Sequence, residues 1–515
     1  MTEVRIVKRL KFNHWLNVCL PLALCAFFYA SPLLANRLHG QQLRFSSTAN
    51  SSALFAVPNG SGKVLLGTRF WLDTPASGSA RYVASLIIAD SSNLAGDASA
   101  QATGRNAKNI NETTKVIVPG QIFVRANTND VENTPMNAAW DGTYWWVLLR
   151  TKTSTGRFVM YLLKVETDGT ITSYSTTCGG SNDLTNSVTY SNYHCFPKDV
   201  IVDSGSLVIT YDRGYSATTP ANTDNDRVAA IAKYTISSAA QSWAPANEAL
   251  VAATDTSGGY GTTPSRGLVK IGTNYFFPYY SITSDGLKVA KYSTSNLTAN
   301  STGFFHNTSV TFDSATFGST PTIKTTTATY LSSNSDSLII GGYLRKNSSS
   351  LWHSFLVFFD SDDGTLKTSY DTDGVYTFQY SPSNVAKDTI LYAITAGNCT
   401  TNLIGVGIQY TTNWKPFVVK LNLNGAAVAA GANWGTSGLF TISEFNHNEA
   451  ASFVNIDTNT SNVIWGGYWS IQSTNDVWRP TSYFNLATSC TDDTILPYPT
   501  SCTWDTLTST QNHNA

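Results

Sequence analysis

A short apolar, β-rich run recurs along the chain at nearly constant spacing. Its seven copies are centred on residues 65, 147, 207, 275, 339, 404 and 464. The successive intervals are 82, 60, 68, 64, 65 and 60 residues. Six similar intervals indicate about seven units of about 65 residues each, the first of which carries an insertion. A repeat of this length strongly limits the folds that the chain can adopt.

A second apolar run follows most copies of the first. These second runs are Ser85-Leu86-Ile87, Leu162-Leu163-Lys164, Ile231-Ala232-Lys233, Val289-Ala290-Lys291, Leu356-Val357-Phe358 and Val418-Val419-Lys420. A polar turn such as Asp168-Gly169 or Asn424-Gly425 comes next. One small antiparallel unit cannot bury both of its faces, whereas units arranged around an axis cover one another and shield their edges. We therefore predict an all-β fold, a single β-propeller of about seven four-stranded antiparallel blades.

The segment Ser335–Phe378 contains the unit in its clearest form. Two β-rich runs, Leu338–Tyr343 and Phe355–Asp360, precede the sequences DGTLKTSY at Asp363–Tyr370 and DGVYTF at Asp373–Phe378. This order resembles the delta-60 repeat family of propeller blades, and a partial copy lies at residues 417–441. The resemblance implies a propeller fold and does not imply one particular activity.

The composition excludes two classes of protein. Aromatic residues make up 12% of the 515 residues, which is too many for a disordered chain. Charged residues make up only 13%, and the formal net charge is −1. A protein that binds nucleic acid needs a basic surface, so we do not expect a nucleic-acid partner. Seven units nearly fill the chain after its N-terminus, which makes one domain sufficient.

The N-terminus has the pattern of a secretory signal. Residues 1–14 contain four Lys and Arg residues, and the mostly apolar stretch Trp15–Ala35 follows. We expect cleavage after Ala35; the alternative is an uncleaved N-terminal anchor, because the run approaches membrane-spanning length. The predicted divisions are the signal peptide or anchor at 1–35, the propeller at 36–490 with an insertion at about 91–137, and a polar tail at 491–515. Residues 42–46 are expected to add a closing strand.

Export makes disulfide bonds possible. The signal contains two of the seven cysteines, and Cys178, Cys195, Cys399, Cys490 and Cys502 remain. Cys178 with Cys195 and Cys490 with Cys502 are close in sequence, and their neighbours are typical of loops, so we predict these two disulfides. Cys399 then remains as a buried thiol. The expected location is secreted, periplasmic or at the cell surface, with no membrane span after signal removal.

The usual catalytic signatures are missing from the sequence. It has no GxSxG nucleophile elbow, no HExxH motif and no phosphate-binding loop. It also has no CxxC pair, and its histidines lack ligand spacing, so no catalytic residue, cofactor or metal site is predicted. The segment Asp360–Gly364 slightly resembles a calcium loop, but Asp371 occupies the twelfth position, where a Glu is expected. A turn is therefore favoured there.

The connections around the first runs are unequal. Those before the runs are short, as at Asp141-Gly142, and those after them are long, as at residues 214–226. Loops of one kind emerge on one face of a propeller, so we expect one elaborated face to bind the ligand. The predicted binding residues on this face are Arg69, Arg150, Arg213, Arg345, Trp352, Trp414, Trp469 and Trp478.

Each residue type in this set has two interpretations. The arginines could form a cationic ring for carboxylates or for sulfated or sialylated sugars. Alternatively, each could be a solvated strand-end arginine that pairs with a local acid. The tryptophans could stack on sugars or anchor a protein partner, or they could pack between neighbouring blades.

Three functional hypotheses follow. The first is an exported non-enzymatic propeller that binds a glycan or protein at a cell surface through the elaborated loop face, and the missing catalytic signatures favour it. The second is a structural or assembly component of a cell envelope or surface filament, which would make the chain part of a larger assembly. The third is a hydrolase or lyase acting on a polysaccharide, which requires acidic residues that converge on the central axis.

Overall fold

A computed structural model gives the fold of the chain. It describes residues 42–44, 51–71, 82–92, 94, 96–97, 99–100, 120–124, 130–176, 194–214, 227–236, 242–243, 246–251, 262–281, 286–298, 310, 312, 314–317, 319, 321–331, 337–370, 373–379, 388–396, 402–410, 414–423, 429–430, 439–441, 449–472 and 478–487. Strands dominate these residues, and helical structure among them is limited to Ser99–Ala100 and the short α3 (Ser314–Phe317).

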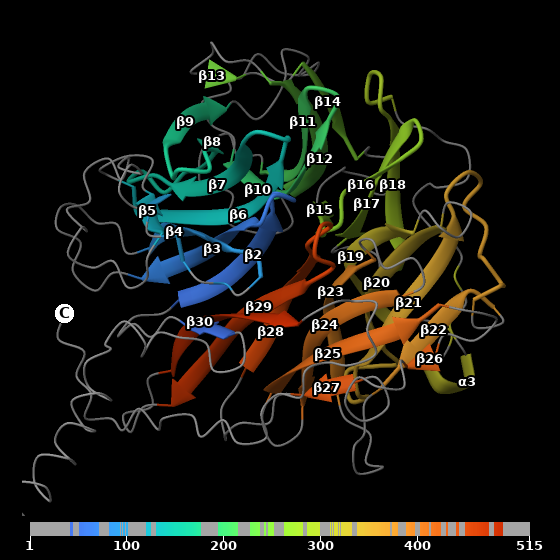
Figure 1. Cartoon of the computed structure of the whole chain (residues 1–515). Coiled ribbons are helices and arrows are strands. Elements are labelled where there is room, and N and C mark those ends of the chain that lie inside the picture. Colours follow the sequence, from blue (N-terminus) through green and yellow to red (C-terminus); the bar gives the residue numbers. More distant parts are fainter. Residues whose placement is uncertain are drawn as a thin grey trace, which may run out of the picture.

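The strands form six hydrogen-bonded sheets, and the nine-stranded sheet divides into two blades at the parallel pair between Tyr82 and Glu132. The resulting seven blades surround one axis, so the chain is a β-propeller, as predicted (Figure 1). Blade 1 contains β2 (Ser51–Pro58), β3 (Lys63–Trp71), β4 (Tyr82–Asp90) and β5 (Gln121–Val124). Blade 2 contains β6 (Glu132–Trp140), β7 (Trp145–Lys152), β8 (Phe158–Val165) and β9 (Ile171–Thr176). Blade 3 contains β10 (His194–Asp203), β11 (Ser206–Gly214), β12 (Arg227–Thr235) and β14 (Asn247–Leu250). The short β13 (Ser242–Trp243) runs parallel to β9 at the edge of blade 2.

Blades 4 to 7 follow the same order. Blade 4 contains a first strand split into β15 (Thr262–Pro264) and β16 (Val269–Ile271), then β17 (Asn274–Ser281) and β18 (Lys288–Ser293). Blade 5 contains β19 (Thr322–Leu331), β20 (Ser337–Arg345), β21 (His353–Asp360) and β22 (Val375–Phe378), and blade 6 contains β23 (Thr389–Thr395), β24 (Asn402–Tyr410), β25 (Trp414–Asn422), β26 (Ala429–Ala430) and β27 (Leu439–Thr441). Blade 7 contains β28 (Glu449–Ile456), β29 (Val463–Gln472) and β30 (Trp478–Ala487). The first apolar run of each repeat is the second strand of a blade, and the second run is the third strand.

The N-terminal strand completes the last blade. β1 (Gln42–Arg44) pairs antiparallel with β30, with Gln42 opposite Asn485. The predicted closing strand is therefore confirmed. Side chains of blade 7 also reach blade 1: Ser452 Oγ donates to the carbonyl oxygen of Ala53 at 3.1 Å, and Asn455 Nδ2 donates to that of Ala56 at 3.0 Å. These bonds join the two ends of the ring.

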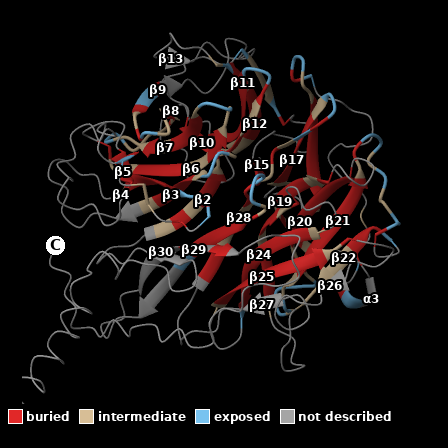
Figure 2. Ribbon diagram, viewed as in Figure 1, coloured by how far each residue is buried: buried red, intermediate tan, exposed pale blue. Residues whose placement is uncertain are grey.

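The hydrophobic core lies between the blades. Among the described residues, each of the seven interfaces between neighbouring blades holds a cluster of buried side chains, and a smaller cluster contains Ile390, Ile408 and Ala450. The cluster that contains Phe453 and Leu66, for example, joins blade 7 to blade 1. Figure 2 shows the buried residues along the middle of the strands in every blade. Burial on both faces of each blade explains why the apolar runs are nearly continuous.

A lysine at the end of the second apolar run ties one blade to the next. Lys233 Nζ donates to the carbonyl oxygen of Thr294 at 3.1 Å, one repeat away. Lys291 Nζ donates to the carbonyl oxygens of Ser361 at 3.3 Å and Asp362 at 2.9 Å, again one repeat away. The segment that resembled a calcium loop is a turn, and the ammonium group of Lys291 lies against its carbonyl oxygens.

Replacing Lys291 tests these links between blades. The change Lys291→Met keeps most of the apolar stem but leaves two carbonyl oxygens without their charged donor. We expect the free energy of unfolding to fall by about 1.5–3 kcal/mol, the usual contribution of a hydrogen bond to a charged group. Chemical denaturation measures it. The exposed Lys346 gives the matched control, Lys346→Met, which should change stability by less than about 0.5 kcal/mol. Equal effects of the two changes would contradict this role for Lys291.

Candidate functional site

The two faces of the ring differ in their connections. We call the face that carries the loops from second to third strands the loop face, and the opposite one the turn face. Ten and twelve residues separate the second strand from the third in blades 1 and 3, whereas four and two residues separate the first strand from the second. In blades 6 and 7 the order is reversed: three and five residues separate the second strand from the third, and six residues separate the first strand from the second in each. The predicted elaboration therefore holds for part of the rim only.

The first strand of each blade lies nearest the axis in Figure 1 and is irregular at one point. Register shifts interrupt β2, β6, β10, β19, β23 and β28, and in blade 4 the first strand is split between β15 and β16. Such β-bulges bend a strand and redirect its side chains, often beside functional sites. The bulges bend these strands near their middle. No sequence pattern used above predicted them.

Arg266 connects three of these irregular strands. From the interruption in blade 4, its Nη1 donates to the carbonyl oxygen of Leu54 at 2.8 Å and its Nη2 to that of Met136 at 3.0 Å. Leu54 and Met136 are the bulge residues of blades 1 and 2. Asp199 Oδ2 accepts hydrogen bonds from the backbone N–H groups of Gly267 and Leu268 at 2.7 and 2.9 Å. These bonds fix blades 1 to 4 relative to one another at the axis.

The first strand of blade 2 begins with an ionised carboxylate on the loop face. Glu132 Oε1 accepts hydrogen bonds from Arg150 Nη2 at 2.5 Å and from Thr134 Oγ1 at 2.7 Å. Burial alone would raise the pKa of Glu132, but the charge and hydrogen bond of Arg150, the hydroxyl of Thr134 and the charge of Arg69 outweigh it and lower the pKa below its ordinary value. Glu132 can therefore accept protons or hydrogen bonds throughout the neutral pH range.

A second group, made of aromatic and charged side chains and His194, lies near Glu132 at the junction of blades 2 and 3. The rings of Phe158 and Phe196 lie 4.8 Å apart, and the guanidinium of Arg227 lies 4.0 Å from the Phe196 ring. His194 Nδ1 accepts a hydrogen bond from the backbone N–H of Phe158 at 3.2 Å. Burial lowers the pKa of His194, and the positive charges of Arg157 and Arg227 lower it further. His194 is therefore neutral at pH 7.

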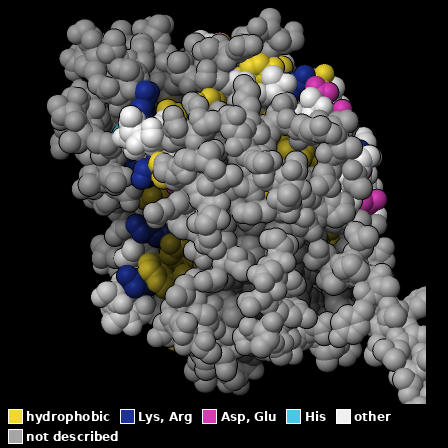
Figure 3. Space-filling model, turned by 90° about the vertical axis from the view of Figure 1, so that its left-hand side faces the viewer, with side chains coloured by type: hydrophobic (Ala, Val, Ile, Leu, Met, Phe, Trp, Pro, Cys, Tyr) yellow, Lys and Arg dark blue, Asp and Glu magenta, His cyan; other side chains and the backbone are white. Residues whose placement is uncertain are grey.

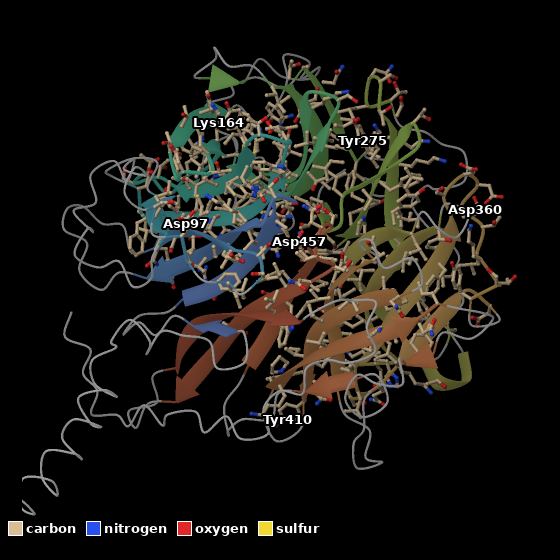
Figure 4. The ribbon with its side chains drawn as sticks, in the orientation of Figure 1. Asp97, Lys164, Tyr275, Asp360, Tyr410 and Asp457 are labelled. Carbon is tan, nitrogen blue, oxygen red and sulfur yellow. The ribbon has the colours of Figure 1, made fainter. Side chains whose placement is uncertain are left out.

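Blades 5 and 6 present aromatic side chains on the same face. Tyr343 and Trp352 make an edge-to-face contact with ring centroids 4.9 Å apart, and Tyr392 and Trp414 pack against the same small cluster. Tyr410 lies 5.2 Å from Trp414 and is 41% exposed. In Figure 4, Tyr410 lies at the outer edge of the ring. The aromatic residues thus extend from the bulge in β23 toward the periphery.

The hydroxyl groups of the inner tyrosines are protonated. Burial raises the pKa of Tyr343 above its ordinary value, and nearby Tyr280 adds to the shift. Burial likewise raises the pKa of Tyr392, as do Tyr343 and Tyr468. These phenols are hydrogen-bond donors at neutral pH and cannot act as bases there.

The predicted binding arginines occupy three register positions. Arg69 and Arg150 hold equivalent positions on their second strands, one residue beyond the residue that pairs with the first strand just before its bulge. The charges of both arginines lower the pKa of Glu132. Arg213 lies one position farther along its strand and forms an ion pair with Glu248 at 3.6 Å. Arg345 lies two positions farther along and stacks over Trp352 at 4.1 Å. The structure therefore brings together Arg69 and Arg150 but not all four arginines.

The tryptophans and cysteines are only partly described. Trp352 and Trp414 belong to the aromatic group above, whereas the side chains of Trp469 and Trp478 lie outside the described part of the chain. Cys195 is disulfide-bonded, and Cys178, Cys399, Cys490 and Cys502 lie outside the described residues, as does the predicted signal. Within the described ranges, no three His, Cys, Asp or Glu side chains gather as metal ligands would, and no helix there could cross a membrane.

The turn face has a different character. Asp203 accepts hydrogen bonds from Tyr275 and, at 2.5 Å, from Lys270 Nζ, and Asp457 is fully buried near the centre of the ring in Figure 4. Asp141 Oδ1 accepts the backbone N–H groups of Thr143 and Tyr144, each at 2.7 Å. These acids stabilise short turns. Figure 3 shows Lys and Arg along the left edge of the molecule, and Asp and Glu at the right, where Lys or Arg side chains also occur.

Comparison with known proteins gives similarity at the level of structure only. No family model matches the chain, and no curated protein matches it. A periplasmic gluconolactonase of Pseudomonas aeruginosa has 10% identity and a TM-score of 0.40, over 84% of this chain and 95% of that one. The Hadza microbial sialidase Hz136 has 10% identity and a TM-score of 0.38, over 74% of this chain and 64% of that one. A subtype N11 neuraminidase-like protein of A/flat-faced bat/Peru/033/2010 (H18N11) has 9% identity and a TM-score of 0.35, over 89% of this chain and 97% of that one.

These comparisons correct the first functional hypothesis. The prediction of a non-enzymatic protein that binds a glycan or protein is wrong, because the similar structures carry the names of a lactonase, a sialidase and glycoside hydrolases. The same structures overturn the preference, based on the missing catalytic signatures, for a protein without enzymatic activity. All of these TM-scores lie below 0.5, so the activity of this chain is inferred below from its own residues.

Proposed function

We propose that this propeller is an exported carbohydrate-acting enzyme, a hydrolase or lyase whose substrate is a polysaccharide bound on the loop face. One observation supports the proposal above the others. The loop face combines an ionised carboxylate, Glu132, close to two arginines, with a row of partly buried aromatic side chains on blades 5 and 6. Export is proposed from the N-terminal signal sequence.

Each half of this face has a distinct chemical task. Aromatic rings stack on the apolar faces of sugars, and tyrosine hydroxyls donate to sugar oxygens. The partly exposed Tyr410 and Trp414 extend this surface outward, as a chain of several sugar units requires. Glu132 is the group that we assign to the chemical step, as a base that activates water or removes a proton from the sugar. Arg150 orients Glu132 and keeps it ionised.

A polysaccharide panel tests this function. The full-length purified protein is incubated with neutral and acidic polysaccharides, and new reducing ends are measured. Ultraviolet absorbance of an unsaturated product distinguishes a lyase from a hydrolase. We expect cleavage of at least one polymer, and we expect Trp352→Ala to raise KM because it removes a ring of the aromatic half. Absence of cleavage across the panel would overturn the proposal.

A further inference from the structure

The cationic side chains of the loop face are concentrated at the junction of blades 2 and 3. Phe158 and Phe196 form its centre, 4.8 Å apart. Lys152 Nζ lies 5.6 Å from the Phe158 ring, the guanidinium of Arg150 lies 5.5 Å from the same ring, and that of Arg227 lies 4.0 Å from the Phe196 ring. We call the following five residues the cationic cluster: Arg150, Lys152, Arg157, Lys198 and Arg227.

The carboxylates against this cluster are fewer than its cations. Glu132 pairs with Arg150 at 2.5 Å. Asp212 is fully buried and is shared by two members, with Lys198 Nζ at 3.5 Å and Arg227 Nη1 at 3.9 Å. Among the described residues, these two carboxylates pair with three of the five cations, and Asp130 adds a third negative charge nearby, because it and Arg157 both act on the pKa of Tyr161.

His194 reports on the local potential. Its ring stacks with Phe196, 6.0 Å between centroids, and lies 6.1 Å from Phe158. After burial, the charges of Arg157 and Arg227 are the causes that lower its pKa. A neutral imidazole amid these groups can donate a hydrogen bond from Nε2 while Nδ1 accepts one from the backbone of Phe158. The site thus offers a neutral donor among cations, which suits an anion.

The rest of the loop face differs from this junction. On blades 5 and 6 the cluster of Tyr343, Trp352, Tyr392 and Trp414 is aromatic, with apolar Ile390 and Ile408 beneath it. A ligand that covers both regions therefore meets rings at one end and positive charge at the other. Neutral polysaccharides have no group that would use the cationic end.

We propose that the cationic cluster binds the carboxylate or sulfate groups of an acidic polysaccharide, which makes a polyanionic glycan the substrate of the loop face. The inference rests on the proposed function, because it names the substrate class of the same site. Arginines in this cluster can hold a carboxylate or sulfate through two parallel hydrogen bonds, and Lys152 adds a mobile point charge at the strand end. Uronate and sulfate share this chemistry, and the experiment separates them.

Binding to matched charged and uncharged polymers tests the inference. Polygalacturonate and its methyl ester differ mainly in charge, as do a sulfated chondroitin and its desulfated form. We expect the full-length protein to bind a charged polymer at least about tenfold more tightly than its neutral or less charged counterpart at low salt. This preference should weaken as added salt screens the charges. Preference for the uronan or for the sulfated polymer identifies the anion.

Variants locate the binding. Lys152→Ala combined with Arg157→Gln should weaken binding of the charged polymer about tenfold or more and leave binding of the neutral one unchanged. Lys346→Ala is the matched control, because Lys346 likewise lies at the loop-face end of a second strand but outside the cluster. In addition, the pKa of His194, followed by NMR and assigned with His194→Gln, should rise when the charged polymer binds.

The outcomes separate this inference from the proposed function. Cleavage of neutral polymers with no preference for charge would overturn the inference and leave the enzyme proposal standing. Charge-dependent binding that the double variant abolishes, with no cleavage of any polymer, would support the cationic cluster and overturn the enzyme proposal. Equal weakening by Lys346→Ala and by the double variant would overturn the assignment to the cluster.

Discussion

Glu132→Gln is expected to lower kcat on the cleaved polysaccharide by about 10²–10⁴-fold, the contribution usual for a general base. The amide keeps an oxygen that can accept the hydrogen bonds of Arg150 and Thr134, so the change removes basicity and charge with little change of shape. The fold of the variant should therefore be intact. Initial rates at saturating substrate measure the effect, with circular dichroism to check the fold.

The pH dependence gives a second view of the same residue. Arg150, Thr134 and Arg69 overcome burial and keep the pKa of Glu132 below its ordinary value of 4.5. The base form is therefore present above this pH, and the acid limb of the pH–rate profile should fall below about pH 4.5. The stability of the fold depends on pH in the same direction. The stabilisation from ionised Glu132 is complete above the pKa that this residue has in the unfolded chain, and it is lost as the pH falls through the lower pKa of the folded state.

Glu248→Gln is the matched control. Glu248 is also an arginine-paired carboxylate, since it pairs with Arg213 and accepts a hydrogen bond from Tyr211. It lies on β14, the outer strand of blade 3, away from the first strands. This change should affect stability without lowering kcat. If Glu132→Gln retained more than half of the wild-type rate, Glu132 would not be the base.

Gly407→Ala is expected to lower the free energy of unfolding by about 3 kcal/mol or more, because overpacking of a rigid backbone contact is among the costliest substitutions. A Cβ built on Gly407 would overlap the carbonyl oxygen of Ile390, on the neighbouring first strand beside the bulge. The ring of Phe417 blocks the other side, 2.9 Å from the same Cβ. Neither atom can move without displacing a strand.

The same contact recurs in neighbouring blades, which makes the prediction general. Gly342 and Gly467 hold the equivalent register position, and a Cβ on them would overlap the carbonyl oxygens of Lys324 and Ala450. Gly205→Ala is the control: Gly205 has a φ of 76° but open space around it, so only backbone strain of about 1–2 kcal/mol is expected. Urea denaturation measures both changes. A smaller loss for Gly407→Ala than for Gly205→Ala would contradict the role given to the bulge.

The repeat predicted the architecture well because it reflects burial. Every first apolar run is a second strand, and every second run is a third strand, since these two strands lie in the middle of each blade and are buried on both faces. The segment that resembles the delta-60 repeat family forms β20, β21 and β22. The bulge in β19 explains the glycine near the end of the run Leu338–Tyr343, because Gly342 leaves room for the carbonyl oxygen of Lys324.

The candidate site was harder to predict because its residues are not periodic. Glu132 lies at the start of a first strand, and the first strands have no strong apolar pattern. Arg266 connects positions more than 100 residues apart, which no local pattern can indicate. The connection at Asp141–Gly142 is short, as predicted, but the local sequence did not indicate that the carboxylate of Asp141 accepts the N–H groups of Thr143 and Tyr144 and so supports a four-residue turn.

Hydrogen exchange of the full-length protein with and without the panel polysaccharide of highest affinity tests most directly whether the loop face is the glycan site. The prediction is slower exchange at the loop-face ends of β6, β8 and β23, which hold Glu132, Phe158 and Tyr392. No change is expected in the turns at Asp141–Tyr144 and Asp457–Asn462 on the opposite face. Protection confined to those turns, with the loop-face strands unchanged, would contradict the assignment of the site.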